Sequence, residues 1–271
     1  MKRRRGVCRC VLLWGLPPAF LVVVVFAMSF FSRNEVETWP AGASSSPPAV
    51  AESEPARFRE ARARMVQYDL ASRDITDPRV LEAMGRVPRQ EFMPARFARD
   101  AYRDGPLPIG HGQTISQPYI VALMTQLVQP KPESKTLDIG TGSGYQAAVL
   151  AELCDHVYGI EIVEPLAESA RTRLAALGYK NVTVRQGDGY QGWKELAPFD
   201  AIVVAAAADH VPQPLVDQLA PGGRLVMPVG NYFQELLLVE KRDDGSVDRR
   251  TVAAVAFVPM TGEAREERPA E

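Results

Sequence analysis

The sequence predicts an α/β fold with a doubly wound, mostly parallel seven-stranded sheet. From residue 136 onward, short apolar stretches alternate with helical patterns, as in chains that build parallel sheets. A glycine-rich turn, residues 140–144, follows the first of these stretches, where such folds hold a ligand. The chain has 271 residues and is 46% hydrophobic, enough for one large globular domain with appendages.

The N-terminal segment, residues 1–33, combines a basic cap with an apolar stretch. Residues 11–31 carry no charge, and as a helix they would span about 31 Å, matching a hydrocarbon core of about 30 Å. We therefore expect a membrane anchor, with residues 1–5 as its cytoplasmic end. A cleaved signal ending near the small residues 41–43 is one alternative, and a start codon assigned too far upstream is another.

The next segment, residues 34–56, is rich in Ser, Pro and Ala and is expected to be a flexible linker. The remaining residues, 57–271, form the predicted folded domain. Within it we expect N-terminal helices and a substrate loop over 57–135, a cofactor-binding sheet over 136–260 and a disordered tail over 261–271. The Gly- and Pro-rich stretch 104–118 is predicted to be a loop, with Pro118 opening a helix.

The predicted sheet follows the order of the apolar stretches. Residues 200–205 are continuously apolar apart from their first residue, which is typical of a buried parallel strand. The last two stretches have no helix between them, so we expect a hairpin at that edge. The expected strands cover residues 136–139, 157–162, 182–185, 200–205, 224–229, 234–240 and 254–258.

The charge distribution and the spacing of cysteines and histidines argue against two classes of function, nucleic-acid binding and metal binding. The first 33 residues carry six positive charges and no acid, which leaves 25 basic against 33 acidic residues in the rest. An acidic body is a poor match for a phosphate backbone, so nucleic acid is not an expected partner. The three cysteines and three histidines lack metal-ligand spacing, and we expect no metal site.

The motif that carries the chemistry is the glycine-rich turn with the residues just before it. Residues 137–145 read LDIGTGSGY, which places Asp138 at the strand end and Gly140, Gly142 and Gly144 in the turn. A dinucleotide fingerprint requires Gly-x-Gly-x-x-Gly because a pyrophosphate rests on the helix N-terminus. The spacing here is Gly-x-Gly-x-Gly, which favours S-adenosylmethionine, a ligand without pyrophosphate. A purely structural tight turn is the alternative.

Two later acids strengthen the prediction of a nucleoside cofactor. Glu161 ends the second strand, where a carboxylate can accept hydrogen bonds from both ribose hydroxyls. Asp188, followed by Gly189, comes after the third strand, where a carboxylate can meet the adenine amino group. Each acid alone is better explained as a solvated charge at a strand end, and the combination with the glycine-rich turn favours the cofactor.

Several blocks between about residue 57 and residue 259 match a known family. They are residues 87–89 with Phe92, 107–110, 114–118, 137–145, 187–189, 192–193, 198–202, 228–230 and 257–259. On these blocks the chain resembles the protein-L-isoaspartate O-methyltransferase family. The resemblance implies the Rossmann-like methyltransferase fold and methyl transfer from S-adenosylmethionine to L-isoaspartyl, and weakly D-aspartyl, carboxylates of damaged proteins.

The resemblance also implies roles in the substrate site. Ser116 matches the family's active-site serine, whose hydroxyl would hold one oxygen of the acceptor carboxylate. Thr114, Ile115, Gln117 and Val258 are expected to bind the substrate peptide. Simple capping of the following helix is the alternative role for Thr114 and Ser116, and packing of a core strand is the alternative for Val258.

One departure and several alternatives accompany this hypothesis. Ala205 stands where the family commonly has threonine, which puts rate or substrate preference in doubt. A small-molecule O-methyltransferase and a non-catalytic, membrane-tethered peptide-binding protein are the alternative functions. S-adenosylmethionine is made in the cytosol, so we expect a cytoplasmic, monomeric catalytic domain, although the basic cap favours a membrane-anchored or exported one.

Overall fold

The computed structural model describes residues 54–266, and the predicted anchor at 11–31 and most of the predicted linker lie outside this range. Within residues 54–266, no helix is both long and apolar enough to cross a bilayer. The helices are α1 (Ala56–Arg64), α2 (Pro78–Arg86), α3 (Pro118–Val128), α4 (Tyr145–Ala151), α5 (Glu164–Ala176), α6 (Gln213–Asp217) and α7 (Glu263–Glu266). Shorter helical turns cover Met65–Leu70, Arg89–Phe92, Ala95–Asp100 and Lys194–Leu196.

The seven-stranded sheet confirms the predicted fold class. Its strand order is β5-β4-β3-β6-β7-β8-β9, parallel from β5 to β7 and antiparallel at β8 and β9. Since β3 has β4 on one side and β6 on the other, the crevice for a ligand lies at the carboxyl end of β3. The strands are β3 (Lys135–Ile139), β4 (His156–Glu161), β5 (Val182–Gln186), β6 (Phe199–Val204), β7 (Leu219–Val229), β8 (Gln234–Lys241) and β9 (Val247–Val255).

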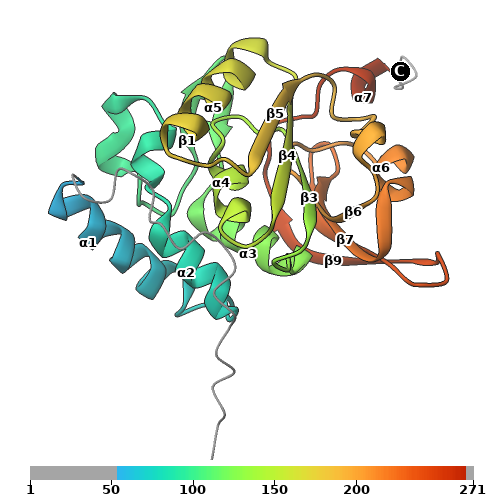
Figure 1. Ribbon diagram of the computed structural model, residues 1–271, viewed down its shortest axis with the longest axis horizontal. Helices are drawn as coiled ribbons and strands as arrows, with labels where there is room; N and C mark the ends of the chain where they lie inside the picture. Colours follow the sequence, from blue (N-terminus) through green and yellow to red (C-terminus); the bar gives the residue numbers. More distant parts are fainter. Residues whose placement is uncertain (1–53, 267–271) are drawn as a thin grey trace, which may run out of the picture. The chain divides into compact units, whose positions relative to one another are not determined.

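Helices cover both faces of this sheet (Figure 1). On one face, α1 to α5 bury a core that includes Met84, Leu150 and Val203. On the other, Leu215 of α6 packs with strand residues such as Ile202 and Leu225. Such burial on both faces explains why the parallel strands are continuously apolar in sequence.

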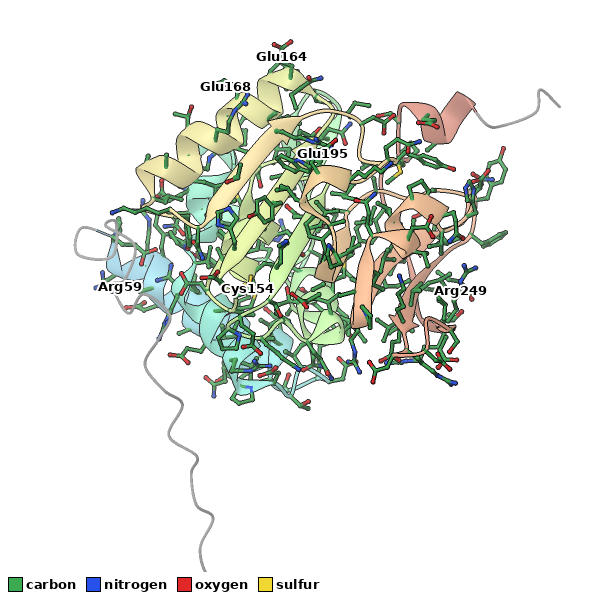
Figure 2. All side chains as sticks on the ribbon, turned by 45° about the vertical axis from the view of Figure 1, so that its right-hand side comes forward. Arg59, Cys154, Glu164, Glu168, Glu195 and Arg249 are labelled. Carbon is green, nitrogen blue, oxygen red and sulfur yellow. The ribbon has the colours of Figure 1, made fainter. Side chains whose placement is uncertain are left out.

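Helix starts follow local signals in the sequence. Asp77 caps α2 by accepting a 2.9 Å hydrogen bond from the backbone nitrogen of Arg79, with Pro78 opening the helix. Pro118 opens α3 in the same manner. Figure 2 shows Glu164 and Glu168 projecting from α5 away from the sheet, and both are exposed. The polar side of α5 therefore faces solvent while its apolar side packs on the sheet.

Two segments differ from the sequence-based expectation. The stretch 104–118, expected to be a loop, contains a small antiparallel hairpin of β1 (Leu107–Gly110) and β2 (Gln113–Ile115). The last strand, expected at 254–258, is β9 instead, and its charged residues such as Arg249 lie at the sheet edge (Figure 2). Charges on an edge strand prevent pairing with other chains. Because of these charges, β9 lacks the apolar pattern that predicts a strand.

The ends of the folded domain also extend beyond the expected boundaries. Glu54 is buried and forms a 2.7 Å ion pair with Arg62 of α1, so the fold includes the last residues of the expected linker. At the other end, α7 occupies part of the expected tail. Glu54 also accepts a 2.7 Å hydrogen bond from Gln90, and the backbone nitrogen of Glu263 in α7 donates one of 2.8 Å to Asp188. Residues distant in sequence thus hold both ends, which a local pattern does not reveal.

Candidate active site

The glycine-rich turn between β3 and α4 brings bare backbone into a cavity at the carboxyl end of the parallel strands. Gly140, Gly142 and Gly144 have φ of 77°, 54° and 92°, a region that residues with a Cβ rarely adopt. Gly140 and Gly142 line the cavity. Gly144 instead caps α4, where an added Cβ would lie 3.1 Å from Leu174.

Glu161 stands beside this turn at the end of β4. Its side chain is buried and lines the cavity. One carboxylate oxygen accepts a 2.7 Å hydrogen bond from the backbone nitrogen of Gly142, and the other accepts one of 2.9 Å from Val163. A carboxylate has about four lone-pair positions, so capacity remains for a ligand's hydroxyl groups. The predicted contact with ribose therefore fits this position.

Asp138, the acid that precedes the turn, is fully buried and lies behind the cavity wall. Neither of its carboxylate oxygens has a hydrogen-bond partner among the described residues. Burial raises the pKa of Asp138 to about 7, and the charge of Glu161 acts in the same direction. Because Asp138 does not line the cavity, its predicted contact with the cofactor stays a prediction.

The pKa of Asp138 predicts how stability depends on pH. Because its pKa is higher in the folded than in the unfolded chain, the folded state binds more protons between about pH 4 and pH 7. Asp138 therefore contributes stability to the cofactor-free protein that is lost as pH rises through this window, whereas Glu54 and Asp77, whose pKa values are lowered, act in the opposite direction. The free energy of unfolding of Asp138→Asn relative to that of wild type should therefore increase with pH in urea titrations from pH 4.5 to 7.5. A difference between the two proteins that does not change with pH would contradict this expectation.

Asp188 follows β5 but does not line the cavity, whereas its neighbour Gly189 does. The Asp188 carboxylate accepts a 2.9 Å hydrogen bond from the backbone nitrogen of Tyr190 and one of 2.8 Å from that of Glu263. The C-terminal segment thus holds this acid beside the cavity. The predicted contact of Asp188 with adenine stays a prediction.

Four of the predicted substrate residues lie on β2 and directly after it. Thr114, Ile115 and Ser116 all line it. Gln117 lines a neighbouring groove of about 450 Å³, and its amide nitrogen donates a 2.7 Å hydrogen bond to Asp104. The loop therefore presents side chains to two adjoining spaces.

Four residues line both the cavity and the groove. They are Thr114, Ser116, Ala205 and Val258. Ala205 follows β6, and its backbone nitrogen donates a 2.8 Å hydrogen bond to Ile139 of β3. Val258 is fixed by its carbonyl, which accepts a 2.9 Å hydrogen bond from the backbone nitrogen of Ala207. These residues form the junction at which a molecule in the groove would meet one in the cavity.

The structure also adds residues to which the sequence assigned no role. Met260 and Thr261 line the cavity from the C-terminal segment. Arg89, which is fully buried, donates a 2.7 Å hydrogen bond to the carbonyl of Ser116 and stacks over the ring of Tyr145. Residues 87–89 are part of the family resemblance, but the sequence does not indicate which groups Arg89 contacts.

Among the described residues, no group of three or more His, Cys, Asp or Glu could hold a metal ion.

Comparisons with known proteins agree with this geometry. Residues 60–265 match the family described as "Protein-L-isoaspartate(D-aspartate) O-methyltransferase (PCMT)". A protein from Syntrophobacter fumaroxidans named protein-L-isoaspartate O-methyltransferase 2 is 53% identical, over 90% of this chain and 96% of its own length. A protein of the same name from a Polaromonas species is 61% identical over 69% of this chain and 90% of its own.

A solved structure is similar as well. It comes from Plasmodium falciparum, is assigned as a protein-L-isoaspartate O-methyltransferase and contains S-adenosyl-L-homocysteine. It superposes with a TM-score of 0.65 at 29% identity, and the match covers 74% of this chain and 98% of the other.

Proposed function

The chain belongs to the protein-L-isoaspartate(D-aspartate) O-methyltransferase family, and we propose on that premise that it methylates the free carboxylate of L-isoaspartyl, and weakly D-aspartyl, residues in damaged proteins. S-adenosylmethionine is the donor. The observation that carries the proposal is the junction of Thr114, Ser116, Ala205 and Val258 between cavity and groove. At these four residues a peptide in the groove would meet a donor in the cavity.

The residues of the cavity suit this donor. The turn at Gly140 and Gly142 allows close approach of the ligand to the backbone, and Glu161 offers acceptors for its ribose hydroxyls. Gly189 leaves space on the wall next to Asp188. When bound, S-adenosylmethionine supplies a methyl group attached to a positively charged sulfur.

The acceptor requires positioning more than acid–base chemistry. A carboxylate has an ordinary pKa near 4, so it is already the nucleophile at neutral pH and needs no general base. The hydroxyl of Ser116 donates to one oxygen and leaves the other facing the cavity. Such alignment lowers a barrier by several kcal/mol without proton transfer. The resulting methyl ester closes to a succinimide, which hydrolyses partly to normal aspartate.

The groove suits an extended peptide. Residues 254–258 run from the end of the edge strand β9 into the segment after it, and they line the groove with apolar residues. The amide nitrogen of Gln117 is held by Asp104, so its oxygen remains to accept from a peptide N–H. Recognition through backbone groups tolerates any neighbouring side chain, as repair of random damage requires.

Matched peptides test the activity directly. We expect labelled S-adenosylmethionine to transfer label to an isoaspartyl peptide and not to its aspartyl counterpart, with the base lability of a methyl ester. Label on a small metabolite alone would favour the small-molecule O-methyltransferase. Binding of donor and peptide without formation of S-adenosylhomocysteine would favour the non-catalytic alternative.

Two substitutions separate the roles of the loop and the acid. Ser116→Ala should lower kcat about tenfold or more, because one hydrogen bond to a charged carboxylate is lost, while the Kd for S-adenosylhomocysteine stays within twofold. Asp188→Ala should weaken cofactor binding about tenfold and affect kcat less. Steady-state kinetics and calorimetry measure both. Parallel losses in the two variants would contradict the assigned roles.

The location of the domain follows from the donor. We place the catalytic domain in the cytoplasm, because S-adenosylmethionine is made there, and we propose separately that the chain is a monomer. A membrane-anchored or exported domain is the alternative that the basic cap and apolar segment suggest. A reporter fused after residue 56 tests the side of the membrane, and light scattering of the purified chain tests the monomer.

A further inference from the structure

Two neighbouring aromatic side chains protrude from the turn between β7 and β8. Tyr232 is 98% exposed and Phe233 is 92% exposed. Elsewhere in residues 54–266, Tyr68 is exposed at 61%, and it lies on the separate turn Met65–Leu70. Turns are usually built from small polar residues, and an adjacent pair of exposed aromatics is typical of an interaction surface.

The backbone of this turn is fixed while the two rings remain free. Gly230 has φ of 125°, and a Cβ there would lie 2.0 Å from the carbonyl oxygen of Phe233. The backbone nitrogen of Gly230 also donates a 2.8 Å hydrogen bond to Ala208. The aromatic pair is therefore presented by a tightly closed hairpin, which reduces the entropy lost when a partner binds.

The aromatic pair lies at the same edge of the sheet as the candidate active site. Strand β7 runs parallel to β6 and β3, so its carboxyl end points toward the edge that holds the cavity. Gln234, directly after Phe233, donates through its side chain to the carbonyl of Phe257 and accepts from the nitrogen of Phe257 at 2.6 Å. Phe257 lines the groove. One side chain thus connects the turn to the groove wall.

From this continuity we propose that Tyr232 and Phe233 form a second docking point for the substrate, and that they bind apolar side chains of the polypeptide that flanks the isoaspartyl residue. The proposal rests on the proposed function, because it takes the groove as the peptide site. An isoaspartyl residue always belongs to a longer chain, and that chain must leave the groove. Apolar flanking residues are accessible in unfolded proteins, so the aromatic pair would favour unfolded over native substrates.

The test compares the full chain with Tyr232→Ser/Phe233→Ser and with Tyr68→Ser as the matched control. The substrates are an isoaspartyl hexapeptide, a 20-residue isoaspartyl peptide with Leu and Phe on both flanks, and the same long peptide with Ser at those positions. We expect kcat/KM of the double variant to fall about tenfold on the apolar long peptide, through KM, and to stay within twofold on the other two. Tyr68→Ser should match wild type on all three.

A binding measurement separates this proposal from the proposed function. Calorimetry of the apolar long peptide, with S-adenosylhomocysteine present, should show weaker binding to the double variant whether or not any peptide is methylated. Equal losses on short and long peptides, or no loss on any, would overturn the docking proposal. It would also be overturned if the double variant lost binding to phosphatidylglycerol vesicles but kept wild-type kinetics and peptide binding, which would point to a membrane surface.

Discussion

Gly189→Ala is expected to weaken the binding of S-adenosylhomocysteine at least tenfold. A Cβ at this position would lie 2.2 Å from the Cγ2 atom of Ile139, far inside contact distance. Both residues line the cavity, and Ile139 is almost fully buried at the end of β3. Relief of the clash must move either the Ile139 side chain or the Gly189 backbone, and both movements change the wall of the cofactor cavity. Overpacking of this kind also costs about 1–3 kcal/mol of stability.

A matched control lies two residues away. At Gly187, an added Cβ would find its nearest neighbours at 4.0 Å, so Gly187→Ala should leave cofactor affinity within about twofold. Adding Ile139→Ala to Gly189→Ala removes the clashing atom and should restore part of the affinity, a coupling that a double-mutant cycle measures. The explanation fails if Gly187→Ala is equally damaging, or if the two substitutions at 139 and 189 act additively.

The sequence anticipated the part of the fold that depends on burial. Parallel strands covered on both faces must be apolar, so β3, β4 and β6 were placed within one or two residues of their observed bounds. Strand β9 was misplaced because it lies at an edge and carries Asp248, Arg249 and Arg250. The apolar pattern instead predicts the last strand at residues 254–258, and these residues line the groove.

The candidate site shows the same division between local and distant determinants. Gly140, Gly142 and Glu161 reach the cavity because strand ends in a parallel sheet meet at one edge, which a sequence pattern can reveal. Asp188 is held by the backbone of Glu263, 75 residues further along the chain. Contacts of this kind come from the path of the C-terminal segment and leave no local signal.

Arg89→Met is expected to lower kcat/KM for an isoaspartyl peptide about 10- to 100-fold with little loss of stability. Arg89 is fully buried, and one of its terminal nitrogens has no hydrogen-bond partner among the described residues. Burial lowers the pKa of its guanidinium, which shows that the surroundings disfavour the charge. Removing this poorly compensated buried charge therefore offsets much of the cost of leaving its two carbonyl partners without a donor.

The expected loss of activity comes from the three segments that Arg89 joins. Its guanidinium donates 2.7 Å hydrogen bonds to the carbonyls of Ala101 and Ser116, and it stacks 4.8 Å from the ring centroid of Tyr145. Tyr145 begins α4 directly after the glycine-rich turn. Arg89 is thus a positioning residue that fixes the Ser116 loop relative to the cofactor cavity. Without it, Ser116 should sample positions from which it no longer orients the acceptor carboxylate.

Three measurements distinguish positioning from a general structural role. In Arg89→Met the Kd for S-adenosylhomocysteine and the urea midpoint should remain close to wild type while kcat/KM for the peptide falls. Arg89→Lys retains one donor and should recover activity in part, since a single ammonium cannot replace the planar fork that reaches both carbonyls. Arg96→Met, at an exposed arginine on the turn Ala95–Asp100, serves as the control and should behave as wild type. A fall in the urea midpoint that matches the loss of activity, with no recovery in Arg89→Lys, would show that Arg89 only holds the fold together.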